Sequence, residues 1–111
     1  MEIIKISVAK DFSKTPGPRY IKEGSFSAEL FLENTLNAQF ESVLKKDAKI
    51  LIDLDGTLGY GTSFLEEIFG GLARKYGADN VTNKIDIIST EEPWLIDDIK
   101  SYVEDVKKQT K

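Results

Sequence analysis

Two acidic residues at the end of an apolar run are the first candidates for chemistry. Asp53 and Asp55 come at the end of the run Ile50-Leu51-Ile52, and Asp55 directly precedes Gly56-Thr57. An apolar, β-branched run predicts a mostly buried strand that ends near Asp55. Carboxylates two residues apart on a strand point to the same side, a placement that suits covalent catalysis by a carboxylate. The structural alternative is that they accept hydrogen bonds from loop amides of the following glycine segment.

Two adjacent hydroxyls form the second candidate. Thr62 and Ser63 follow the loop Gly59-Tyr60-Gly61 and open a segment with helical spacing that runs to Gly77. Ser63 with Glu66 predicts a capping box, in which the two residues bond to each other's backbone N–H groups. A phosphate on either hydroxyl would meet free N–H groups and the positive end of the helix dipole.

The surroundings of these hydroxyls suggest two further roles. The backbone amides of residues 59–63 could form an anion nest for a small ligand or nucleotide. Tyr60, Thr62 and Phe64, together with Glu66 and Glu67, are candidates for a surface that a partner contacts, although the two acids would repel a phosphate. Gly70-Gly71 inside the helix predicts close packing, either on the chain's own sheet or against a partner.

The elements that must position these residues follow from periodicity. Strands are predicted over residues 2–9, 50–55 and 84–89, with a possible short strand over residues 19–22. Helices are predicted over residues 27–46, with Ser25 or Ser27 as cap, over residues 63–76, and from Pro93 to the C-terminus, where Trp94 and Tyr102 extend the core face. Residues 80–83 are expected to be a short connection. The order predicts an α/β fold with a mixed sheet of four or five strands and about three main helices.

Composition limits the classes of function. The 111 residues carry a net charge of −4, with 41% hydrophobic residues and no cysteine or histidine. Disulfides, thiolate nucleophiles, imidazole bases and the usual zinc sites are therefore excluded. An acidic chain without a basic stripe is not typical of nucleic-acid binding. Because no apolar run is long enough to span a membrane, we expect a soluble, cytoplasmic protein without membrane contact.

The segment Asp53-Leu54-Asp55-Gly56-Thr57-Leu58 resembles the nucleophile motif of haloacid dehalogenase-like phosphatases. The resemblance implies a magnesium-dependent phosphatase in which Asp53 attacks phosphorus and Asp55 protonates the leaving group. The order of the remaining parts does not match, because no lysine lies between Thr90 and Asp97, and the acids Asp97 and Asp98 fall in a helix rather than at a strand end.

A second resemblance covers most of the chain. Segments 16–19, 25–31, 52–56 and 59–72 are similar to the STAS-like domain family of unknown function. Against the related STAS domains of anti-sigma factor antagonists, Ser63 falls on the phosphorylated serine and Thr62 on the residue before it. Gly61 and Phe64 depart from that pattern, which has Asp and Gly there. The resemblance implies a small α/β STAS architecture and a histidine-kinase-type ATPase as partner.

We therefore expect residues 1–111 to form one STAS-like domain. The expected function is non-catalytic regulation through protein–protein contact, with Ser63 or Thr62 as the switch and Gly59, Tyr60, Gly61, Phe64, Glu66 and Glu67 as the surrounding surface. No cofactor is expected. The alternatives are a magnesium-dependent phosphatase using Asp53 and Asp55, or a module that binds a small ligand or nucleotide. The sequence leaves self-association open.

Overall fold

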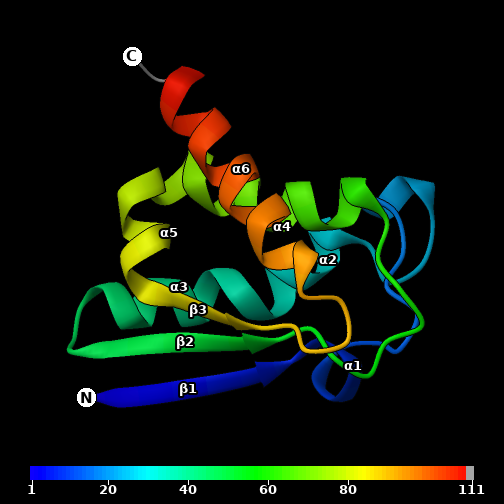
Figure 1. Cartoon of the computed structure of the whole chain (residues 1–111), viewed down its shortest axis with the longest axis horizontal. Helices are drawn as coiled ribbons and strands as arrows, with labels where there is room; N and C mark the ends of the chain where they lie inside the picture. Colours follow the sequence, from blue (N-terminus) through cyan, green and yellow to red (C-terminus); the bar gives the residue numbers. More distant parts are fainter. Residues whose placement is uncertain (110–111) are drawn as a thin grey trace.

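The computed structural model describes residues 1–109, which form one sheet with helices packed against it (Figure 1). The three strands of this sheet are parallel, and β2 lies between the other two. Their bounds are Glu2–Ser7 for β1, Ala48–Asp53 for β2 and Ile85–Ile88 for β3. Ile50 is in register with Ile4 on one side and with Ile85 on the other.

The connection from β1 to β2 is mostly helical. It contains α1 (Val8–Asp11), the 3₁₀ turn η1 (Ile21–Glu23), and one continuous run made of α2 (Ala28–Phe31), the π-helical segment η2 (Leu32–Leu36) and α3 (Asn37–Leu44). The run begins at a predicted cap, because the Ser27 hydroxyl accepts a hydrogen bond from the N–H of Leu30 at 3.1 Å. This confirms the predicted helix over residues 27–46 to within two residues.

The predicted strand over residues 19–22 is wrong, because this segment leads into η1 instead. The reason is that two side-chain carboxylates accept hydrogen bonds from the backbone N–H groups of this segment. The N–H of Tyr20 donates to the Glu23 carboxylate at 3.0 Å, and the N–H of Ile21 donates to the Glu29 carboxylate at 2.8 Å. A segment whose N–H groups are satisfied locally has no need of a neighbouring strand.

The second half of the chain supplies three more helices. They are α4 (Thr62–Tyr76), α5 (Ala78–Lys84) and α6 (Trp94–Gln109). The prediction of α4 is confirmed, and that of α6 is confirmed as far as Gln109, since the last two residues of the predicted helix lie outside the described part of the chain. The connection predicted over residues 80–83 is wrong, because these residues belong to α5. Gly77, with a φ of 100°, turns the chain between α4 and α5, and Val81 is then buried on the core side.

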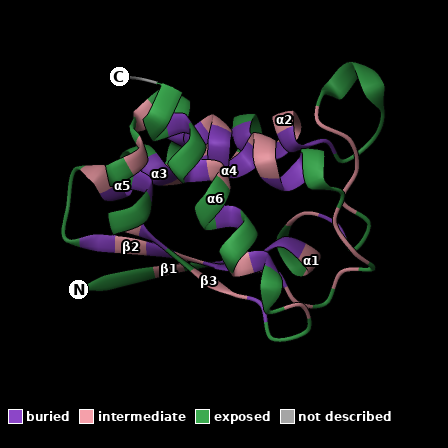
Figure 2. Ribbon diagram, turned by 45° about the horizontal axis from the view of Figure 1, so that its top comes forward, coloured by how far each residue is buried: buried purple, intermediate pink, exposed green. Residues whose placement is uncertain are grey.

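The helices α3, α4, α5 and α6 lie over one face of the sheet (Figure 1), and many of their residues are buried (Figure 2). Ala48, Ile50 and Ile52 of β2 point into this layer of helices and are fully buried or nearly so. On the opposite face, Lys5 pairs with Asp53 at 3.9 Å and Lys49 pairs with Asp86 at 3.5 Å. The sheet therefore has one apolar face and one partly solvated face that carries ion pairs.

The α/β class is confirmed, but the expected mixed sheet of four or five strands is not. Within residues 1–109 the sheet has three strands, all parallel. The expected extra strand is the segment that forms η1, and its loss removes the antiparallel pair that would have made the sheet mixed. No helix in this part of the chain is both long and apolar enough to cross a membrane.

Candidate functional site

The loop between β2 and α4 lies at the carboxyl end of the sheet and is held down by hydrogen bonds along its length. The Tyr60 hydroxyl donates to the carbonyl oxygen of Leu54 at 2.7 Å, and the N–H of Leu58 donates to the carbonyl oxygen of Lys14 at 2.8 Å. Gly56 and Gly59 have φ angles of 91° and 136°, a region that favours glycine. These hydrogen bonds and backbone angles therefore give the loop a defined conformation.

Asp55 joins this loop to the loop between β3 and α6. Its carboxylate accepts hydrogen bonds from the Thr90 hydroxyl and from the N–H of Glu91. The Glu91 carboxylate in turn accepts from the N–H of Gly56 at 2.8 Å. The bonds from Thr90 and then from Glu91 lower the pKa of Asp55, because they stabilise the charged carboxylate.

Asp53 has a similar local role. Its carboxylate accepts a hydrogen bond from the N–H of Asp55 at 2.9 Å and lies 3.9 Å from Lys5 Nζ. Both carboxylates thus have the bonding role expected as the structural alternative, but the expected partners are wrong. Asp53 accepts from the N–H of Asp55 and Asp55 accepts from the β3–α6 loop, rather than from the amides of the glycine segment. Residues 1–109 contain no group of three or more acidic, His or Cys side chains placed to hold a metal ion.

The predicted anion nest over residues 59–63 is partly used by the fold itself. The N–H of Gly59 donates to the Thr57 hydroxyl at 3.3 Å, and the Gly61 carbonyl accepts from the N–H groups of both Phe64 and Leu65. Thr62 and Ser63 follow Gly61, and their N–H groups have no intrahelical acceptor, as at the start of any helix.

The start of α4 differs from the predicted capping box. Gly61 is the N-cap residue, with φ −76° and ψ 148°, and no side chain caps the helix. Thr62 and Ser63 are the first two helical residues, and both are exposed. The capping-box prediction is wrong because Ser63 lies two positions too far into the helix and Glu66 is bonded elsewhere. The Ser63 hydroxyl therefore has no capping role.

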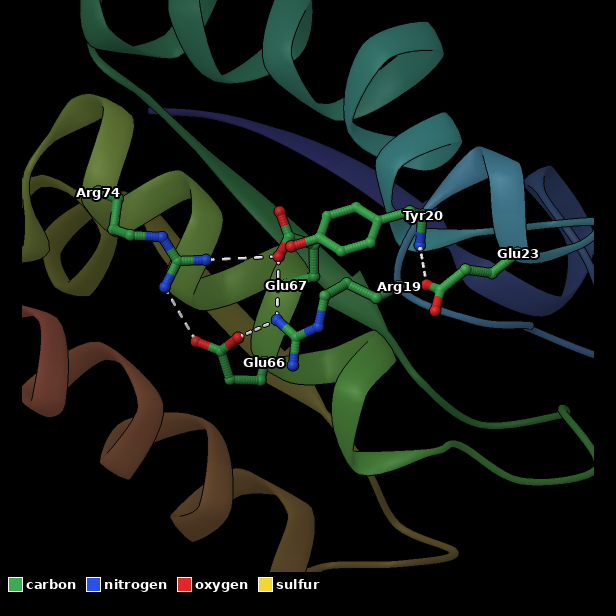
Figure 3. A network of polar contacts seen from close by, with 6 residues as sticks. All are labelled: Arg19, Tyr20, Glu23, Glu66, Glu67 and Arg74. Atoms are coloured by element: carbon green, nitrogen blue, oxygen red, sulfur yellow. Dashed lines mark hydrogen bonds and ion pairs between the residues drawn. The ribbon is translucent and has the colours of Figure 1, made fainter.

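Glu66 and Glu67 form an ion-pair cluster with two arginines from different parts of the chain (Figure 3). Arg19, on the loop before η1, contacts both carboxylates, and its distance to Glu67 is 3.0 Å. Arg74, two turns further along α4, lies 3.0 Å from Glu66 and 3.4 Å from Glu67. Burial alone would raise the pKa of Glu66, but the hydrogen bonds from Arg19 and Arg74 outweigh it, and the net shift is downward.

The ion-pair cluster of Arg19, Glu66, Glu67 and Arg74 also explains the paired glycines. A Cβ on Gly70 would lie 2.4 Å from Glu66 Oε2 and 3.2 Å from Arg74 Nη1, so the bare backbone leaves room for this ion pair. A Cβ on Gly71 would lie 3.3 Å from Leu32 Cδ1. The close packing predicted at Gly70-Gly71 is therefore against η2 and against the ion pair, not against the sheet.

One residue of the predicted partner surface, Phe64, does not lie on the surface. Phe64 is fully buried and packs near Tyr60, with ring centroids 5.9 Å apart, so it belongs to the core. Tyr60 is half-buried, and burial raises its pKa to about 12. Gly61, Thr62 and Ser63 are the exposed members of the predicted set, whereas Gly59, Glu66 and Glu67 are half-buried.

Two exposed apolar side chains near the same end of the molecule were not predicted as surface features. Trp94 is 58% exposed, which contradicts its expected place in the core, and Leu58 is 86% exposed. Trp94, Asp98 and Tyr102 recur every four residues on α6, so they share one face of that helix. Burial and then the charge of Asp98 raise the pKa of Tyr102, and a hydrogen bond with Thr62 lowers it. Since Thr62 is the first residue of α4, this face of α6 lies beside the start of α4.

The comparison with known families agrees with this arrangement. A family model described as a STAS-like domain of unknown function (DUF4325) matches residues 27–94, from the cap of α2 to the first residue of α6. The matched range includes β2, β3, α4 and the loop between β2 and α4. The resemblance predicted from the sequence is thereby confirmed. No curated protein and no solved structure matches the chain.

Proposed function

The chain belongs to the family of STAS-like domains of unknown function, and we propose that it is a regulatory module that binds a partner protein through the exposed start of α4. The observation that carries this proposal is the position of Thr62 and Ser63. Both are exposed in the first turn of a 15-residue helix whose cap is supplied by Gly61. A serine that does not cap its helix is free to take part in chemistry without loss of the fold.

The proposed switch is phosphorylation of Ser63, or of Thr62. Transfer from a nucleoside triphosphate would form a bond between the hydroxyl oxygen and the γ-phosphorus, break the bond to the nucleoside diphosphate and release the hydroxyl proton. The product would carry about two negative charges close to free N–H groups and the positive end of the α4 dipole. Arg19 and Arg74 balance the charges of Glu66 and Glu67, so the repulsion expected from the sequence is largely offset.

The surface around the switch has features that suit a protein partner. Trp94 and Leu58 are large exposed apolar side chains, and tryptophan is enriched among the residues that dominate binding energy at interfaces. The loop that carries Leu58 is linked to the loop before Trp94 through Asp55 and Glu91. A partner seated on these loops would contact the phosphorylated residue at the same time.

We propose an ATPase of the histidine-kinase type as the partner. Such a protein would supply the phosphoryl donor and read the result at the same surface. A bound phosphate would then change the partner's affinity by placing charge inside the contact area.

The test is to isolate a tagged copy of this chain from its native cells and to map phosphate by mass spectrometry on the intact chain and its peptides. We expect phosphate on Ser63 or Thr62 in a fraction of the molecules, together with a co-purifying protein that has nucleotide-hydrolysing activity. The Ser63→Ala/Thr62→Val variant should lack the phosphate. Complete absence of phosphate from both residues, under every growth condition tried, would remove the switch from the proposal.

A further inference from the structure

The strand β3 is an edge strand with little protection against pairing. It has one neighbour, β2, within residues 1–109, and three of its four residues are isoleucines. Natural edge strands usually avoid further pairing by means of lysine, proline, a bulge or a covering element. The one charged residue of β3 is Asp86, which pairs with Lys49 of β2 at 3.5 Å, and none of the four residues is lysine or proline. In a parallel pair every second residue directs its backbone groups away from the neighbour, so β3 offers donors and acceptors along its outer edge.

An apolar groove of about 510 Å³ runs beside this edge, between β3, α5 and α6. Most of its lining is aliphatic, including Ile85, Ile87, Ile96, Ile99 and Val103. Ile87 and Ile96 remain half-buried. On α6, Leu95 is buried in the core, whereas Ile96 lines the groove.

Three charged side chains line the groove: Asp86 on β3, which pairs with Lys49, and two residues of opposite sign on α6. Lys100 and Glu104 line it from α6, one turn apart, and both are exposed. Neither of them forms an ion pair with another side chain in the described part of the chain. A lysine and a glutamate at this spacing on one helix form a self-complementary pattern. A two-fold axis that is perpendicular to the helix sets it antiparallel to its copy and brings each lysine opposite the other copy's glutamate.

We propose that a second copy of this chain covers the groove, with β3 of each copy paired antiparallel to β3 of the other. The two sheets would join into one of six strands, and the two α6 helices would lie side by side over the seam. Ile87 and Ile96 of each copy would be buried there, and Lys100 of each copy would face Glu104 of the other. This interface is separate from the start of α4 and does not depend on the proposed switch.

The order of Lys100 and Glu104 along α6 favours a second copy over an unrelated protein, whereas the net charge of the chain opposes association. Each chain has a net charge of −4, so two copies repel each other at long range and need a local attraction to associate. The alternation of Lys100 and Glu104 provides that attraction only to a surface with the reverse order, and the antiparallel copy is such a surface. Electrostatic matching of this kind selects the partner and fixes the register.

The test uses charge reversal and sedimentation equilibrium over a wide range of concentration. The wild-type chain of 12.5 kDa should associate to twice that mass. Lys100→Glu alone and Glu104→Lys alone should each raise the dimer dissociation constant by more than about tenfold, because like charges then meet across the axis. Lys100→Glu/Glu104→Lys should restore the dimer, and the two single variants mixed in equal amounts should form a heterodimer.

The matched control is Lys14→Glu, an exposed residue of the loop after α1 and outside the groove lining, which should leave the dimer unchanged. All these positions are exposed, so circular dichroism spectra should be the same for all variants. A wild-type chain that stays monomeric at the highest concentration overturns the proposal. So does a dimer that is insensitive to the single reversals, or single variants that fail to pair with each other. Binding of a peptide from another protein to a monomeric chain would assign the groove to that protein instead.

Discussion

A negative charge at Ser63 should stabilise the domain. Ser63→Asp places a carboxylate in the first turn of α4, near N–H groups without intrahelical acceptors. A carboxylate at a helix N-terminus typically adds about 0.3–1 kcal/mol at low salt. The same variant mimics part of the charge of a phosphate, so its effect on stability shows whether the fold accepts the proposed modification.

The opposing contribution is repulsion from Glu66 and Glu67, and the structure shows why it is small. The two carboxylates are paired with the guanidinium groups of Arg19 and Arg74, so the ion-pair cluster has no net charge. A like-charge pair on an exposed helix surface costs about 0.2–0.5 kcal/mol even without such pairing. The balance therefore predicts a net gain of about 0.5 kcal/mol from the helix dipole after this repulsion.

Urea unfolding at low salt measures this balance. For a domain of this size, about 0.5 kcal/mol raises the unfolding midpoint by roughly 0.2–0.5 M urea. The gain should shrink in high salt and should be absent in the neutral variant Ser63→Asn and in Ser101→Asp, an exposed serine in the middle of α6. In the background Arg19→Gln/Arg74→Gln the effect of Ser63→Asp should fall to zero or become unfavourable. A loss of more than about 1 kcal/mol in the wild-type background would contradict the prediction, because it exceeds the repulsion that Glu66 and Glu67 could exert on the new carboxylate.

Three further predictions concern the loop and the core that support the start of α4. Because burial raises the pKa of Tyr60 to about 12 while an unfolded tyrosine ionises near about pH 10, stability should fall as pH rises between these values. Tyr60→Phe should lessen that fall, and an unchanged pH profile would count against the buried, bonded hydroxyl. Phe64→Ala should cost about 3–5 kcal/mol in thermal or urea unfolding, whereas a cost below about 1 kcal/mol would place Phe64 on the surface after all. Asp55→Asn should weaken the bonds to Thr90 and Glu91 and speed amide hydrogen exchange in both loops. Since the pKa of Asp55 is lowered, protonation of its carboxylate in acid should have the same effect on the wild type. Equal exchange rates in variant and wild type would show that these bonds do not hold the loops together.

The elements with strong periodicity could be predicted from the sequence. The run of alternating and β-branched residues in β2 and the helical spacing in α4 and α6 are local signals, and they identified these elements with errors of a few residues at the ends. The segment that forms η1 could not be predicted in the same way. The carboxylates of Glu23 and Glu29 accept hydrogen bonds from backbone N–H groups of this segment, and these bonds compete with the pairing of a β-strand.

Sequence periodicity could not predict contacts between distant parts of the chain. Glu66 has a suitable spacing for a capping box, but Arg19, 47 residues earlier, binds it instead. Trp94 has the residue type of a core position, yet the turn of α6 leaves it exposed and gives the buried position to Leu95. For Asp55 the local prediction was half right, because a bonding role in the loops was expected but its partners, Thr90 and Glu91, belong to another loop.

The affinity of the proposed ATPase partner for variants of Ser63 is the decisive measurement for the proposed regulatory surface. Once that protein has been purified with this chain, its dissociation constant should be measured by calorimetry for the wild type, Ser63→Asp and the control Ser101→Asp. We expect Ser63→Asp to change the dissociation constant by at least about tenfold, because charge enters the contact area, and Ser101→Asp to leave it unchanged. Equal affinities for all three proteins would show that the start of α4 is not the surface the partner reads.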